Sequence, residues 1–162
     1  MILEFKLPAY IVAYLKSLYG SDPYNLANQD FRGIKLQIKL WNLIGSAMPQ
    51  TIIMPRTRVP IRFEIPDSDA ALIAAAKQLE ATDEARREAV FVTEFWTSMV
   101  MFVVGQRNLN KKIRTGEAIE NFLIEFDIPD QALSTDSARR MFNRFLEERP
   151  SLAALSRFEE AS

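Results

Sequence analysis

The sequence lacks two residue types on which much enzyme chemistry depends, since its 162 residues include no cysteine and no histidine. Without cysteine there is no disulfide framework, no thiol nucleophile and no zinc–thiolate site. Without histidine, Ser-His-Asp and Cys-His catalysis within one chain are excluded. Catalysis by carboxylates alone or by lysine stays open. We expect a protein that is not an enzyme and that uses no metal and no other cofactor.

Glycine and long apolar runs are also scarce. The five glycines form neither a GxGxxG nor a GxxxxGK(S/T) pattern, which excludes those two modes of nucleotide binding. The most apolar run, residues 96–104, is nine residues long, whereas a membrane span needs about 20. The opening MILEFKLPAY is not typical of a signal peptide, because Glu4 and Pro8 interrupt it. We therefore expect no membrane partner and a cytoplasmic location.

The apolar periodicity predicts a mainly α (α+β) protein, a helical domain with a small two- to three-stranded sheet. Residues 2–7 and 51–65 alternate as strands do and are expected to pair, with Pro60 indicating an edge position. Helical spacing predicts a first helix with Pro8 in its first turn and its end at Gly20. Further helices are predicted at 28–43, 70–81 and 84–106, from 115 to Pro129, and after a cap at Ser134, Thr135 or Asp136. We expect a single domain, 1–162, with residues 115–162 as a candidate C-terminal helical subdomain.

The charges nearly cancel, with 20 basic and 21 acidic residues, which argues against an unspecific polyanion binder. Glu80, Glu84 and Glu88 stand four apart on one helical face, but without histidine a solvated surface explains them better than a metal site. Basic residues gather in three clusters, for each of which a solvated face competes with phosphate contact. The clusters are Arg32, Lys35 and Lys39; Arg56, Arg58 and Arg62; and Arg107, Lys111, Lys112 and Arg114.

The C-terminal segment has the most specific pattern. Its last predicted helix has a buried stripe and an outer face of Arg140, Asn143, Arg144 and Glu147, with Arg139 on the margin of that face. The stripe consists of Ala138, Met141, Phe142, Phe145 and Leu146. Such an outer face is suited to grip phosphates or read base edges. The connection over residues 127–134 is longer than a helix-turn-helix turn, and five acidic residues in 117–130 oppose DNA. An ordinary amphipathic hairpin is the alternative.

Both ends of the chain resemble small proteins of Bacteroidetes phages and mobile elements. The matching features are the strand and helix leading to Leu18-Tyr19-Gly20, the helix around Phe31-Arg32-Gly33, and the segment from Ala118-Ile119 through Phe126-Asp127-Ile128 to Arg139-Arg140-Met141-Phe142-Asn143-Arg144. The resemblance implies a phage or mobile-element setting and DNA association, and it carries over no catalytic residue. Glu147, Glu148, Glu159 and Glu160 depart from the more basic tail of that family.

Two functions follow as expectations. The first is a non-catalytic, nucleic-acid-associated protein that contacts DNA through its basic C-terminal helix, with Arg107, Lys111, Lys112 and Arg114 as a second candidate surface. The alternative is a structural or assembly protein of a phage-like particle, located in the virion, that binds itself or another phage or mobile-element protein.

Overall fold

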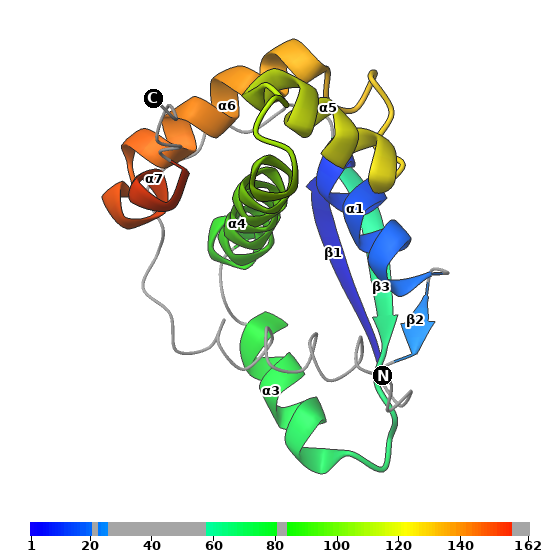
Figure 1. Cartoon of the computed structure of the whole chain (residues 1–162). Helices are drawn as coiled ribbons and strands as arrows, with labels where there is room; N and C mark the ends of the chain where they lie inside the picture. The colour runs from blue at the N-terminus through cyan, green and yellow to red at the C-terminus, as the bar shows by residue number, and fades with distance from the viewer. Residues whose placement is uncertain (21–22, 26–57, 81–83, 157–162) are drawn as a thin grey trace. The chain divides into compact units, whose positions relative to one another are not determined.

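A computed structural model describes residues 1–20, 23–25, 58–80 and 84–156 (Figure 1). The helix expected at 28–43, the cluster of Arg32, Lys35 and Lys39, and Arg56 lie outside the described residues. The elements in chain order are β1 (Ile2–Pro8), α1 (Ala9–Tyr19), β2 (Tyr24–Asn25), β3 (Arg58–Glu64), α3 (Ala70–Glu80), α4 (Glu84–Leu109), α5 (Thr115–Glu125), α6 (Thr135–Glu147) and α7 (Pro150–Ser156).

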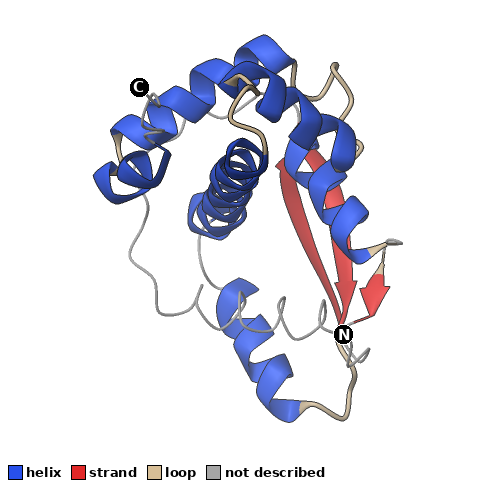
Figure 2. Ribbon diagram, in the orientation of Figure 1, coloured by secondary structure: helices blue, strands red, loops and turns tan. Residues whose placement is uncertain are grey.

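The predicted fold class is confirmed, because helices dominate the described residues and the strands form one small sheet (Figure 2). The chain divides into two compact units, residues 1–93 and 94–162, and the division falls inside α4. The C-terminal unit thus contains the second part of α4 in addition to the segment 115–162. Each unit is described by itself below.

The sheet of the first unit has the order β1-β3-β2, with β1 antiparallel and β2 parallel to β3. The expected pairing of residues 2–7 with the end of 51–65 is confirmed, with Ile2 opposite Glu64 and Lys6 opposite Pro60. The edge position expected for Pro60 is wrong, since β3 is the central strand. Among the described residues β2 pairs with Phe63 and Glu64, so Pro60 lies outside the described β2–β3 pairing and its missing N–H is tolerated there.

Backbone hydrogen bonds fix which groups of β1 face β3. Met1 and Ile65 lie opposite each other and exchange two bonds, of 2.8 and 3.1 Å. Hydrogen-bonded and non-hydrogen-bonded pairs alternate along an antiparallel ladder. The N–H and C=O groups of Leu3, Phe5 and Leu7 therefore face β3, whereas those of the even-numbered residues of β1 point to its outer edge. By the same alternation, the nitrogen of Pro60 lies on the β2 side of β3.

One face of the sheet is apolar and buried. Leu3, Phe5 and Leu7 of β1 are buried, and so are Ile61 and Phe63 of β3. The helix α1 packs against both strands and buries its own apolar stripe. Gly20, with a φ of 87°, ends α1 as the sequence predicts.

The N-terminal part of α4 also belongs to the first unit, where the ring of Phe91 lies 5.2 Å from that of Phe5. Glu88 lies on the same helix and is only 1% exposed, and its carboxylate accepts a charge-assisted hydrogen bond from the guanidinium of Arg58 on β3. The solvated surface expected for Glu88 is thus wrong. A buried carboxylate needs such a partner, because its desolvation is costly without one.

The second unit is built around a row of aromatic side chains. The ring of Phe122 on α5 contacts three others, with centroids 5.5 Å from Phe95, 5.4 Å from Phe102 and 4.6 Å from Phe126. Trp96 is fully buried and lies edge-on to Phe95. α5 packs on α6, and α6 packs on α7. Trp96, Met99, Val100 and Val103 of the apolar run at 96–104 are therefore core, as expected, whereas Met101 on the same run is exposed.

The helix ends of this unit follow known capping rules. Ser134 caps α6, because its hydroxyl accepts a hydrogen bond of 3.2 Å from the backbone N–H of Ser137. α5 ends before Pro129 in a Schellman motif: Ile128 N–H bonds the carbonyl of Leu123, Asp127 N–H bonds that of Ile124, and Asp127 has a φ of 50°. This motif, and not the proline, ends the helix.

Candidate nucleic-acid interface

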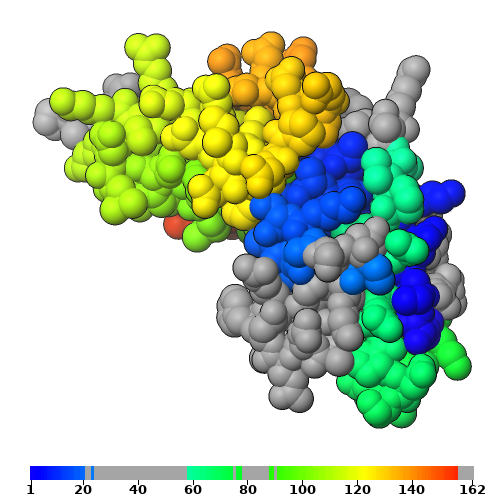
Figure 3. Space-filling model, turned by 90° about the vertical axis from the view of Figure 1, so that its right-hand side faces the viewer, coloured from blue at the N-terminus to red at the C-terminus, as the bar shows by residue number. Residues whose placement is uncertain are grey.

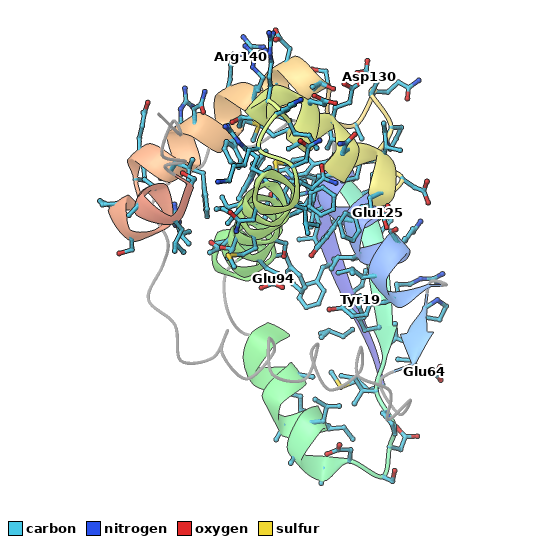
Figure 4. The ribbon with its side chains drawn as sticks, in the orientation of Figure 1. Tyr19, Glu64, Glu94, Glu125, Asp130 and Arg140 are labelled. Carbon is cyan, nitrogen blue, oxygen red and sulfur yellow. The ribbon has the colours of Figure 1, made fainter. Side chains whose placement is uncertain are left out.

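The outer face of α6 carries the basic residues that the sequence singled out. Arg139, Arg140, Asn143 and Arg144 are all exposed, and Figure 4 shows Arg140 pointing away from the helices. The opposite face is buried through Ala138, Phe142 and Phe145 and half-buried through Met141 and Leu146. Because the buried stripe fixes the rotation of the helix, the four polar side chains are held on the solvent side.

The second predicted cluster lies between α4 and α5. Lys111, Lys112 and Arg114 are exposed, whereas Arg107 is half-buried and donates a 2.9 Å hydrogen bond to the hydroxyl of Thr115. Asn110 orders the connection, since its side-chain oxygen accepts a 3.1 Å bond from the backbone N–H of Lys112. Arg107 thus connects the end of α4 to the start of α5. The exposed charges of this cluster are those of Lys111, Lys112 and Arg114.

The two clusters meet at the first turn of α5. Arg114 occupies the N-cap position of α5, whose first turn has no side-chain cap. Arg139 reaches this turn from α6: a Cβ placed on Gly116 would lie 3.3 Å from its Cδ and 3.8 Å from its Nη1. Arg107 bonds the neighbouring Thr115. Arg107 of α4 and Arg139 of α6 therefore lie at a helix N-terminus whose N-cap residue is Arg114 and which itself carries partial positive charge.

Acidic residues border this basic surface. Glu117, Glu120 and Glu125 on α5, with Asp127 and Asp130 beyond it, are all exposed. Figure 4 labels Glu125 and Asp130, which project from the far end of α5 and from the connection to α6. In Figure 3 the end of α4 (lime), α5 (yellow) and the start of α6 (orange) form one continuous surface. The second unit thus presents adjacent regions of opposite charge.

One basic residue near α6 was not singled out by the sequence. Arg149, half-buried, stacks its guanidinium 4.0 Å from the centroid of the Phe145 ring and lies 3.6 Å from the carboxylate of Glu148. Both contacts hold it against the end of α6. It therefore helps to anchor the helix and is not counted with the exposed arginines.

Other classes of site find little support in the part of the chain that the structure describes. There, no three acidic side chains come together as a metal would require. None of the described helices has both the length and the hydropathy needed to cross a bilayer. Comparison with protein-family models, with curated proteins and with solved structures finds no match. The exposed arginines of α6 and the basic residues at the start of α5 make the basic surface of the second unit the candidate site.

Proposed function

We propose that this protein is a non-catalytic, nucleic-acid-associated protein of a phage or mobile element, and that it contacts DNA phosphates through the second unit. The observation that carries the proposal is the meeting of Arg107, Arg114 and Arg139 at the start of α5. The phage or mobile-element setting rests on the sequence resemblance alone.

The chemistry of the surface suits phosphate recognition. Arginine offers a planar fork of donors that matches phosphate oxygens, and backbone N–H groups at a helix N-terminus add further donors. Arg140 and Arg144 stand one helical turn apart and extend the surface along α6. Asn143 lies between them and is the side chain on this face best suited to a base edge. In this proposal Arg107 and Arg139 position the surface, and Arg114, Arg140 and Arg144 contact phosphate.

The proposal is tested by fluorescence-anisotropy titration of labelled duplex and single-stranded DNA at several salt concentrations. For wild type, the logarithm of the DNA-binding constant is expected to fall linearly with the logarithm of the salt concentration. In Arg140→Ala/Arg144→Ala the slope of this line should become less steep by about 0.9 for each phosphate that is no longer bound. The matched control is Lys16→Ala/Lys77→Ala, which removes two exposed charges from the first unit. It should leave the slope unchanged.

Two results would count against the proposal, and a third would change which residues carry it. Wild type that binds neither duplex nor single strand at micromolar protein and low salt would end it. A control variant that weakens binding as much as the α6 variant would show only a general effect of charge. An unchanged α6 variant would move the contact to Lys111, Lys112 and Arg114.

The second candidate function is an assembly protein that binds copies of itself. The observation that favours it is the outer edge of β1, which no described strand covers. This function does not compete with the first for residues, because β1 belongs to the first unit and the basic surface to the second.

A further inference from the structure

The outer edge of β1 presents unpaired backbone groups among the described residues. The alternation along the β1–β3 ladder directs the N–H and C=O groups of Ile2, Glu4 and Lys6 away from β3. Their side chains are exposed on the open face of the sheet, where Ile2 retains half of its accessible surface. In Figure 2 β1 and β2 lie on opposite sides of β3. An edge of this kind is a template for another strand.

We propose that β1 pairs in antiparallel fashion with β1 of a second copy of this chain, about a two-fold axis that passes beside Phe5. In this register Glu4 of each copy lies opposite Lys6 of the other, and Phe5 lies opposite its own counterpart. A two-fold interface requires that residue i meets residue j and that j meets i. The sequence Glu4-Phe5-Lys6 satisfies this requirement with opposite charges at both symmetric positions.

The hydrogen-bond geometry selects the same register. Glu4 and Lys6 both point their backbone groups outward, so each Glu4–Lys6 pair forms a hydrogen-bonded pair and the two copies exchange both bonds there. Phe5 bonds its own β3, and so it falls at the non-hydrogen-bonded position on the axis. Pro8 has no N–H to donate at the end of the strand, which limits the ladder to the residues before it.

Neighbouring registers are disfavoured by charge. A shift by two residues in one direction puts Glu4 opposite Glu4, and a shift in the other direction puts Lys6 opposite Lys6. Like charges directly opposite each other on a strand pair are destabilising, and opposite charges are favourable. A one-residue shift would place outward-pointing backbone groups opposite groups already bonded to β3. The edge thus specifies one pairing with itself.

This complementarity is the reason to choose a second copy as the occupant. Lysine and proline on an edge strand often prevent association. Here the lysine charge is matched by a glutamate two residues away on the same strand and face, so self-pairing neutralises it. A single strand pair buries less area than a standard protein interface, so the dimer is expected to be weak and reversible.

The test is sedimentation equilibrium of the full chain at protein concentrations from about 10 µM to about 1 mM. Over these concentrations a weak interface changes from mostly dissociated to mostly associated. Wild type should be a reversible dimer. Glu4→Lys and Lys6→Glu should each raise the dissociation constant about tenfold or more, because both symmetric pairs become repulsive. Glu64→Lys, on the same face of the central strand, is the control and should dimerise like wild type.

An equimolar mixture of the Glu4→Lys and Lys6→Glu variants adds a rescue to this test. One variant carries two positive charges at the paired positions, and the other carries two negative charges. Each variant repels its own copies, but both pairs between the two variants are attractive. The mixture should therefore regain dimer at the concentrations at which wild type forms it.

Three outcomes would overturn the inference. Wild type that stays monomeric throughout the range would show that Lys6 and Pro8 protect the edge instead. Dimers that survive in both single variants would place self-association elsewhere, and so would a mixture of the two variants that does not associate. None of these outcomes bears on DNA binding, which the salt titration measures with residues of the second unit.

Discussion

Helices α5 and α6 differ in their outer faces far more than in their inner ones. Both bury small and aromatic residues against the second unit's core, with Ala118 and Phe122 on α5 and Ala138 and Phe142 on α6. Outside, α5 exposes Glu117, Glu120 and Glu125. α6 exposes three arginines and an asparagine, together with Asp136 and Glu147 near its two ends. The inner faces therefore explain why both are helices packed together, and only the outer faces distinguish what each offers to a partner.

The inner faces are expected to contribute most to stability, and to contribute alike. Phe122→Ala and Phe142→Ala each remove a buried ring, so each should lower the free energy of unfolding by about 3–5 kcal/mol. Urea titration followed by far-UV circular dichroism measures the loss. The matched control is Ile124→Ala on the exposed side of α5, which should stay within about 0.5 kcal/mol. A loss for one phenylalanine alone would show that the two helices are not supported equally.

The two helix starts should differ in their sensitivity to substitution. Ser134→Ala removes the hydroxyl that caps α6 and is expected to cost about 1 kcal/mol of unfolding free energy. Arg114→Ala, at the N-cap of α5, removes no side-chain cap and should change that free energy by less than about 0.5 kcal/mol. Thermal denaturation of both variants makes the comparison. Equal losses would mean that Arg114 stabilises α5 by some other contact.

The acidic face should have the smallest effect, and it should act on binding rather than on folding. Glu117→Gln/Glu120→Gln removes two exposed negative charges beside the basic surface, so DNA affinity at low salt is expected to rise about threefold. The gain should disappear as salt is raised, because the charges are then screened. Glu64→Gln in the first unit serves as control in the same anisotropy assay. An unchanged or lower affinity would mean that α5 faces away from bound DNA.

The sequence predicted those features that depend on local patterns. The stripe of α6 and the exposure of Arg140 and Arg144 follow from helical spacing. For the cap the sequence offered Ser134, Thr135 or Asp136, and Ser134 is the one that caps α6. The strand character of residues 2–7 and of the end of 51–65 follows from alternation within each segment. These signals lie within one segment, where residue order and geometry are directly linked.

Features that depend on distant residues were not predictable. Nothing in the order of residues places Arg139 over Gly116, because that contact depends on how α6 packs on α5. In the sequence Glu88 has the same spacing as Glu80 and Glu84, so it was expected on a solvated surface. Its burial depends on the ion pair with Arg58 of β3, a residue thirty positions away in the chain. The two-residue strand β2 and the seven-residue helix α7 are too short to show a period. Asp127 takes a backbone conformation that glycine usually supplies, so no glycine marked the end of α5.

Pro60 limits where further strands can be added to the sheet when copies of the chain associate. A strand placed beside residue 60 on the β2 side of β3 would have a carbonyl with no N–H donor opposite it, because proline has none. Ordered addition of strands is therefore interrupted on that side of β3. Among the described residues, the edge of β1 is then the only long one, and a two-fold pair consumes it in both molecules. A sheet with a single usable edge forms a closed pair and not a fibre, which separates reversible dimerisation from amyloid-like aggregation.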